Sequence, residues 1–210
     1  MTKPTLDDLL NLVKQIIIPF YQVKRHLPIR AEGGRYENDA EHSWSVGLMA
    51  AALAPHIDPK LDIGKICQFA IVHDLVEVHA GDTSNFAEEA IKATKDNREE
   101  VALRKLQEDL ATLPWIPATI KEYEAQTTIE AQFVKSVDKL LPLMFDYLEE
   151  GLFYQESKIT VEEWKKQLRK HREKASKHNG AFIYYDELWN LLLANPHFFH
   201  APSGKSMDAL

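Results

Sequence analysis

Apolar residues recur at steps of three and four along most of this chain, which is the spacing of one face of an α-helix. No run of alternating apolar and polar residues indicates a β-strand. Clusters of Pro and Gly near 28–34, 80–84 and 113–119 mark breaks in the helical pattern. We therefore predict an all-α protein, with helices near residues 5–18, 40–55, 60–79, 86–112, 128–150, 160–178 and 184–194.

The length of the chain bounds its organisation. With 210 residues, of which 45% are hydrophobic and 27% charged, it fits one globular domain with a sizeable core. We expect a single-domain, multi-helix bundle over residues 1–200, with its functional core at about 25–150 and C-terminal helices at 160–195. The mostly small and polar residues 201–210 predict a loosely ordered tail.

Charge and cysteine usage restrict the partners of the chain. A formal net charge of −7 argues against a nucleic-acid backbone as the main partner, because such binding depends on Lys and Arg neutralising phosphates. The longest near-apolar runs, such as Ile16–Phe20, are far too short to cross a membrane, and the chain starts without a signal-like segment. The single cysteine, Cys67, cannot form an intramolecular disulfide. We expect a cytoplasmic protein that binds neither nucleic acid nor a membrane.

The stretch HDLVEVHAGD, residues 73–82, places ionisable side chains where an apolar helical stripe ends. His73 and Glu77 continue the stripe of Ile66 and Ala70, and Asp74 lies one step round the helix. A carboxylate removed from water needs a cation, a network of donors or a shifted pKa. Two or three carboxylates beside one histidine therefore indicate a metal. For His73 alone, a histidine that caps a core helix is the simpler interpretation.

Two further helices carry an ionisable residue on an apolar face. His42 shares a face with Val46, and Asp138 shares a face with Val134 and Leu141. Metal sites in helical bundles are built from side chains that face inward from several helices. The predicted metal ligands are His42, His73, Asp74 and Asp138. Two imidazoles and two carboxylates suit one divalent ion, which could be Mn, Co, Fe, Ni, Zn or Mg, and leave positions for water and substrate.

The order of these residues, an isolated His, an adjacent His-Asp pair and a distant Asp, resembles the HD-domain metal-dependent phosphohydrolases. EHS at 41–43, HDxxEVxxGD at 73–82 and VKxxDKL at 134–140 are similar to motifs of the YfbR-type 5'-deoxynucleotidases and of the eukaryotic HD-domain-containing protein 2 family. The resemblance covers roughly Arg25–Glu150. It implies a metal-dependent hydrolase of nucleoside 5'-monophosphates that favours deoxyribonucleotides and forms a homodimer.

Two acidic residues of the motif are candidates for the chemistry. A bound metal would activate the attacking water. Glu77 lies one turn after His73, and its counterpart in the family is thought to act on that water, so we predict it to be the general base. Asp82 could protonate the leaving 5'-oxygen or bind the sugar hydroxyl, or it could instead cap the next helix.

Substrate binding calls for cations beyond the metal. The basic segment KRHLPIR contains Arg25 and Arg30, and arginine suits bidentate binding of phosphate. The family carries an Arg followed by a large aromatic residue here, and Arg25-His26 is the best match. The predicted substrate-binding residues are Arg25, His26, Arg30 and Thr83. The charged segment at 97–110 is interpreted as a solvated amphipathic helix.

Three functions stay open at this point. The first is a 5'-nucleotidase that uses a metal-activated water on (deoxy)nucleoside 5'-monophosphates. The second keeps the metal but cleaves a phosphodiester or a nucleotide polyphosphate, as other HD domains do. The third is a metal-stabilised helical module for ligand sensing or dimerisation, which would need neither Glu77 nor Asp82.

Overall fold

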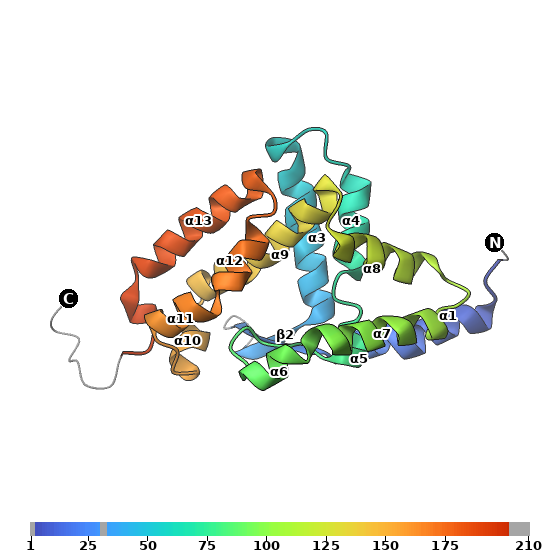
Figure 1. Ribbon diagram of the computed structural model, residues 1–210, viewed down its shortest axis with the longest axis horizontal. Helices are drawn as coiled ribbons and strands as arrows, with labels where there is room; N and C mark the ends of the chain where they lie inside the picture. Colours follow the sequence, from blue (N-terminus) through green and yellow to red (C-terminus); the bar gives the residue numbers. More distant parts are fainter. Residues whose placement is uncertain (1–2, 30–32, 202–210) are drawn as a thin grey trace. The chain divides into compact units, whose positions relative to one another are not determined.

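A computed structural model describes residues 3–29 and 33–201 of the chain. Helices dominate these residues, which confirms the predicted all-α class (Figure 1). None of the helices found in them is both long and apolar enough to cross a membrane. The helices are α1 (Leu6–Leu12), the π-helix η1 (Val13–Ile17), α2 (Ile18–Phe20), α3 (Asp39–Ile57), α4 (Ile63–Val72), α5 (Glu77–Ala80), α6 (Glu89–Ala93), α7 (Lys95–Asp109), α8 (Trp115–Ala125), α9 (Ile129–Leu148), α10 (Leu152–Glu156), α11 (Val161–Gln167), α12 (Arg169–Ala175), α13 (Asn179–Leu193) and the 3-10 helix η3 (Pro196–Phe198).

The expectation that the chain contains no strand was wrong. β1 (Lys24–Ile29) and β2 (Arg35–Asn38) pair in a two-stranded sheet. The two strands show no alternation of apolar and polar residues, because charged residues occupy positions that face inward. Arg25 is partly buried between the exposed Lys24 and His26, and Glu37 is buried on β2.

Several helical predictions also needed correction. The helices expected over 86–112 and 160–178 are each divided into two, and the helix expected over 184–194 begins at Asn179. The helix expected over 60–79 is divided, because α4 ends at Val72 and α5 begins at Glu77. The Pro-rich stretch at 113–119 was expected to be a break, yet α8 begins within it. Its two prolines stand at the N-cap and in the first turn, where a helix needs no backbone N–H from them.

The described residues form two compact units. The first contains residues up to Arg25 together with Glu37–Val134, and the second contains His26–Tyr36 and residues from Lys135 onward. The predicted single domain over 1–200 stays a prediction, and residues 202–210 of the predicted tail lie outside the described residues.

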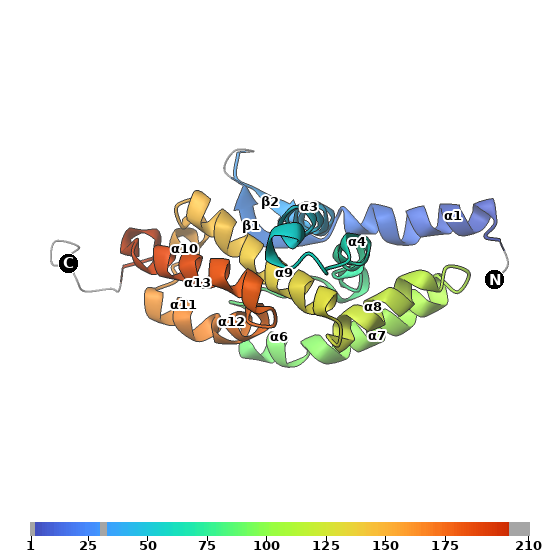
Figure 2. The same ribbon diagram turned by 90° about the horizontal axis from the view of Figure 1, so that it is seen from above.

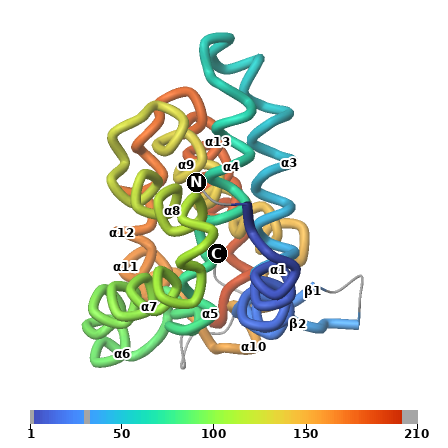
Figure 3. Tube along the Cα trace, turned by 90° about the vertical axis from the view of Figure 1, so that its right-hand side faces the viewer, coloured from blue at the N-terminus to red at the C-terminus, as the bar shows by residue number. Residues whose placement is uncertain are grey.

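Within the first unit, α3 and α4 run side by side, as Figure 2 and Figure 3 show, and α5 packs against α7. A buried apolar cluster joins the N-terminal helices to α7, α8 and the segment that follows α4. Its members are Ile16, Phe20, Val72, Leu75, Val76, Ala102, Leu106, Leu110 and Ile120. This cluster holds the His73–Asp82 stretch from its apolar side.

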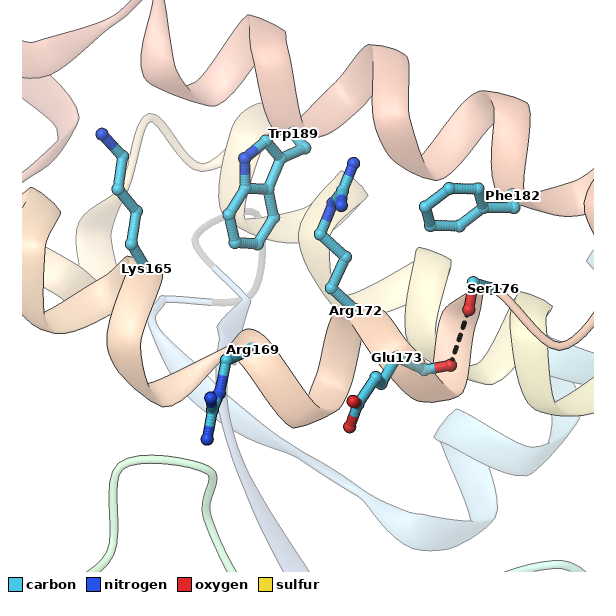
Figure 4. Close-up of a pocket in the computed structure, with 7 residues that line it drawn as sticks. All are labelled: Lys165, Arg169, Arg172, Glu173, Ser176, Phe182 and Trp189. Carbon is cyan, nitrogen blue, oxygen red and sulfur yellow. Dashed lines mark hydrogen bonds between the residues drawn. The ribbon is translucent and has the colours of Figure 1, made fainter.

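The second unit has an aromatic core. The ring centroid of Trp164 lies 4.0 Å from that of Trp189, and the Tyr154 ring stacks on Phe199 with centroids 5.1 Å apart. An open pocket lies between α11–α12 and α13 (Figure 4). There the Arg172 guanidinium reaches between two rings, at 5.2 Å from the centroid of Phe182 and 5.6 Å from that of Trp189.

Gly151 makes a close approach that no other residue type can make. Its φ is +68°, and an added Cβ would lie 2.2 Å from the carbonyl oxygen of Phe198. We expect Gly151→Ala to lower the free energy of unfolding by about 2–4 kcal/mol, measured by urea unfolding. Gly34→Ala is the control, since Gly34 has φ +78° but open space around a Cβ, and it should lose only about 1 kcal/mol. Equal losses in both variants would contradict the steric explanation.

Asp146 makes stability depend on pH. Burial raises the pKa of its carboxyl from 3.8 to about 7, although the hydrogen bond donated by the Tyr154 hydroxyl opposes the shift. Between these values the folded protein keeps a proton that the unfolded chain loses, so stability falls as pH rises through this window. Asp146→Asn cannot ionise. Its stability relative to the wild type should therefore grow by up to about 1.4 kcal/mol per pH unit from pH 4 to 7 and level off above. Parallel unfolding profiles of the two proteins would refute the assignment.

Candidate metal centre

His73 is positioned by the end of α4. It is the C-cap residue of this helix and is 2% exposed. Its Nδ1 lies 2.9 Å from the carbonyl oxygen of Ala70 and donates to it, so Nε2 carries the lone pair. Nε2 lies 3.2 Å from Oδ2 of Asp74, the next residue. The imidazole is thus held in the orientation that a metal ligand requires.

His42 is positioned by the start of α3. Asn38 caps this helix in a capping box with Glu41, so neither residue is available to the site. One turn later His42 is fully buried, with Nδ1 3.4 Å from Oε2 of Glu37 and Nε2 3.9 Å from Oδ2 of Asp74. A carboxylate behind the Nδ1 of a histidine is the usual support of a metal-binding imidazole.

These three side chains fit a divalent ion. The Nε2 atoms of His42 and His73 both face Oδ2 of Asp74, at 3.9 Å and 3.2 Å. Two ligand atoms that each lie about 2.1 Å from one ion are roughly 3–4 Å apart. The donor set of two neutral imidazoles and a carboxylate suits a first-row divalent metal. The structure therefore brings His42, His73 and Asp74 together, and their role as metal ligands stays a prediction.

Beside the histidines lies a cluster of three carboxylates. Oxygen atoms of Asp39, Asp74 and Glu77 lie within 4.8 Å of one another. The backbone N–H of Glu77 donates to the carbonyl oxygen of Asp74 at 2.9 Å, and this tight i to i+3 turn places the two side chains on one side. Three acidic groups at this separation require positive charge nearby.

Arg25 supplies part of this charge. Its Nη1 donates to Asp74 Oδ2 at 2.9 Å and to Asp39 Oδ1 at 3.3 Å, while Nε lies 3.4 Å from Glu37 Oε2. Burial alone would lower the pKa of the guanidinium, but the surrounding carboxylates, Asp74 foremost, raise it above its usual range. Arg25 therefore stays charged and is held by three acidic partners.

The environment makes two of the carboxylates hard to ionise. Burial, and then the charge of Asp74, raise the pKa of Asp39 to about 7, although Arg25 opposes this. Burial, followed by Asp74, Asp82 and Asp39, also raises the pKa of Glu77, while Lys95 opposes the rise. A carboxyl with a raised pKa beside a metal-type donor set is typical of an acid or base in catalysis.

The remaining sequence-predicted residues lie in different surroundings. Asp82 is half-buried and close enough to Asp39 and Glu77 to raise their pKa values, and it does not cap the next helix, because the N-cap of α6 is Glu88. The hydroxyl of Thr83 accepts a hydrogen bond from Arg98 at 2.6 Å. His26 is exposed on β1. Arg30 lies outside the described residues.

Asp138 belongs to the second unit. It is 1% exposed in the middle of α9, with Lys139 Nζ at 2.9 Å and Lys135 Nζ at 3.9 Å from its Oδ2. A buried carboxylate in mid-helix has no capping role there. Its place in the ligand set stays a prediction.

Sequence reasoning missed four residues of the site. Glu37 and Asp39 could have been recognised from the sequence. The capping box uses Asn38 and Glu41, so these two neighbouring acids have no role in capping the helix. Lys95 and Arg98 belong to the first turn of α7. The interpretation of 97–110 as a solvated helix implied that Arg98 faces solvent. Lys95 Nζ lies 3.9 Å from Glu77 Oε1, and Arg98 donates to the carbonyl oxygen of Ala80.

Comparison with known proteins places the chain in a family. The HD-domain family model matches residues 21–179, more than half of the chain. The chain therefore belongs to the HD-domain family. It is 27% identical over 178 residues to the 5'-deoxynucleotidase hdd1 of Schizosaccharomyces pombe, a match that covers 77% of this chain and 87% of that protein. It is 32% identical over 109 residues to the human 5'-deoxynucleotidase HDDC2, a match that covers 50% of each.

Solved structures show the same fold. A crystal structure titled "Predicted metal-dependent phosphohydrolase", from Magnetospirillum magnetotacticum, superposes with a TM-score of 0.76 at 27% identity, over 93% of this chain and 96% of that one. A conserved hypothetical protein from Pyrococcus furiosus superposes with a TM-score of 0.57 at 21% identity, over 90% of this chain and 99% of that one. The second likeness concerns the fold alone.

The role of Arg25 as the counter-charge of the cluster can be tested directly. Arg25→Met leaves Glu37, Asp39 and Asp74 without their shared partner, and we expect the free energy of unfolding to fall by about 3–5 kcal/mol at pH 8. The loss should be smaller at pH 5, because protonation of the crowded carboxyls relieves their repulsion. Lys24→Met, on the exposed side of the same strand, is the control and should change stability by about 0.5 kcal/mol or less. A loss that does not depend on pH would contradict this role.

Proposed function

We propose that the chain is a metal-dependent phosphohydrolase that removes phosphate from (deoxy)nucleoside 5'-monophosphates. The observation that carries the proposal is the convergence of His42, His73 and Asp74 beside Glu77, in a chain of the HD-domain family. Two relatives named 5'-deoxynucleotidase and a structural neighbour named as a metal-dependent phosphohydrolase support the reaction class.

In this proposal, His42, His73, Asp74 and Asp138 hold one divalent ion. Asp138 is included because its carboxylate is buried in mid-helix and because the segment VKxxDKL at 134–140 resembles the family motif that ends in an Asp. When bound, such an ion lowers the pKa of a water molecule and neutralises a phosphate oxygen. The donor set is compatible with Mn, Co, Fe, Ni, Zn or Mg.

In this proposal Glu77 is the general base, which accepts a proton from the attacking water. Its carboxyl is 4% exposed, and this burial, followed by the charges of the neighbouring acids, raises its pKa and makes it a better base than an ordinary surface glutamate. The positive charge of Lys95 keeps the ionised form accessible. Glu77 can therefore accept a proton and release it again within one catalytic cycle.

Asp82 and the predicted substrate residues complete the proposal. Asp82 follows α5 at the edge of the carboxylate cluster, where it can protonate the leaving 5'-oxygen or accept a hydrogen bond from the sugar. Arg25, His26, Arg30 and Thr83 are proposed to contact the nucleotide. His26 is smaller than the aromatic residue of the family, which makes crowding of a ribose 2'-hydroxyl weaker at this position.

The test of this function is a substrate panel on metal-loaded protein. Deoxyribo- and ribonucleoside 5'-monophosphates should release inorganic phosphate fastest, compared with a cyclic diester, a linear diester and a nucleoside triphosphate. Absence of phosphate release from every monophosphate would refute the proposal. Faster cleavage of a diester or a triphosphate would indicate that the protein is a phosphodiesterase or a nucleotide polyphosphate hydrolase.

Two variants separate metal binding from proton transfer. Glu77→Gln should retain metal and lose turnover by about 10²–10⁴-fold, whereas Asp74→Ala should lose the metal itself. Metal content by elemental analysis and kcat by phosphate release are the measurements. Glu100→Gln is the control, because Glu100 pairs with Arg104 on the exposed side of α7 and should retain both. Full activity in Glu77→Gln would remove this residue from the mechanism.

We also propose that the protein acts as a homodimer. An exposed apolar stripe along α1 and η1 supports this, with Leu6, Leu10, Val13 and Ile17 at 70%, 56%, 40% and 36% exposure. The residues recur at steps of four and three, so they share one helical face. Light scattering should report twice the chain mass, and Leu10→Glu should reduce it to that of a monomer. A wild type of monomer mass would refute the assignment.

A further inference from the structure

The phosphate of a substrate would enter a site crowded with negative charge. Oxygens of Asp39, Asp74 and Glu77 lie within 4.8 Å of one another, and Asp82 adds its charge to the same group. Arg25 is one of the two arginines that the sequence suggests for phosphate, yet its guanidinium already has Glu37, Asp39 and Asp74 as partners. A second protein cation is therefore needed where the phosphate binds.

Lys95 meets this need from the first turn of α7. Its side chain is 33% exposed, and its Nζ lies 3.9 Å from Glu77 Oε1 and 3.3 Å from Glu99 Oε1. The separation from Glu77 is an ion pair that is too long for a hydrogen bond. The ammonium carries three N–H donors on a flexible stem, so donors are available for a phosphate oxygen beside the catalytic carboxylate.

The charge of Lys95 is secured by its surroundings. Burial would lower the pKa of the ammonium, but Glu99, Glu77 and Asp74 raise it above its ordinary value. Lys95 is thus a charged, partly exposed hydrogen-bond donor beside the carboxylate cluster.

Arg98, one turn along α7, positions the loop that carries Asp82. Its Nη1 donates to the carbonyl oxygen of Ala80, and its Nη2 donates to the Thr83 hydroxyl at 2.6 Å. These bonds bracket Gly81 and Asp82 from both sides. The first turn of α7 therefore contributes one cation to the loop and one to the cluster, at the i to i+3 spacing of a helical face.

We propose that Lys95 is a phosphate-binding residue, whose ammonium donates to a non-bridging oxygen of the nucleotide 5'-phosphate next to Glu77. Arg98 is the positioning residue that holds the Asp82 loop, and Arg25 neutralises Glu37, Asp39 and the proposed ligand Asp74. The identity of the phosphate as that of a nucleotide rests on the proposed function, whereas the role of Lys95 as an anion donor does not.

The experiment compares Lys95→Met, which keeps the length of the side chain, with Lys95→Arg, which keeps its charge. Lys105→Met is the matched control, since Lys105 lies on the same helix and pairs with Asp109 at 3.0 Å. Each metal-loaded variant is titrated with inorganic phosphate by calorimetry and assayed for KM and kcat on the best nucleotide. Metal content and thermal melting are measured in parallel.

Loss of one charge-assisted hydrogen bond predicts a rise of about 10- to 100-fold in both the phosphate dissociation constant and KM for Lys95→Met. Metal content and melting temperature should match those of the wild type. If Lys95 had only a structural role, weaker phosphate binding would instead come with a loss of metal or of thermal stability. Lys95→Arg should restore most of the affinity, and Lys105→Met should equal the wild type.

Unchanged phosphate affinity in Lys95→Met would overturn the proposal, as would a loss of affinity that charge in Lys95→Arg does not restore. A wild type that binds inorganic phosphate through Lys95 but hydrolyses no nucleotide would leave this inference intact and refute the nucleotidase function. Hydrolysis of nucleotides with equal KM in the wild type and in Lys95→Met would support the nucleotidase function and refute the role of Lys95.

Discussion

The charge of one partly buried arginine holds the candidate site together. Arg25 comes from β1, Glu37 from β2, Asp39 from the start of α3 and Asp74 from the turn after α4, and the three acids meet at the same guanidinium. Carboxylates placed this close, two of them almost fully buried, repel one another strongly unless a cation lies among them. β2, the start of α3 and the turn after α4 therefore each bring one carboxylate to Arg25.

The short hairpin gains its importance from this interaction. A two-stranded sheet is marginal by itself in water, and this one has few apolar residues facing inward. Its inward positions instead supply Arg25 to the carboxylates and Glu37 to the back of His42. The sheet serves to deliver charge to the site, which explains why its sequence shows no apolar alternation.

The break after α4 has a similar consequence for the predicted metal ligands. In a continuous α-helix, Asp74 would point about 100° away from His73, and Glu77 would lie one α-helical turn beyond. The tighter i to i+3 bonding at this point brings Asp74 and Glu77 to one side, where Asp74 faces both imidazoles. A single local change in winding thus places the predicted metal ligand Asp74 and the predicted base Glu77 on the same side.

The sequence by itself determined the helical class and the inward position of His42, His73 and Asp138, because apolar periodicity is a local property of the chain. The family motif added Asp74, Glu77 and Asp82 as a group. Only the tertiary structure decided which charges meet, since Arg25 and Asp74 are 49 residues apart and their pairing leaves no periodic trace. For the same reason periodicity assigns no role to Lys95 and places Arg98 on a solvated helix, whereas in the structure α7 begins beside Glu77 and Thr83. Periodicity records the side of an element that is buried, whereas the partner of a buried charge depends on contacts between distant segments.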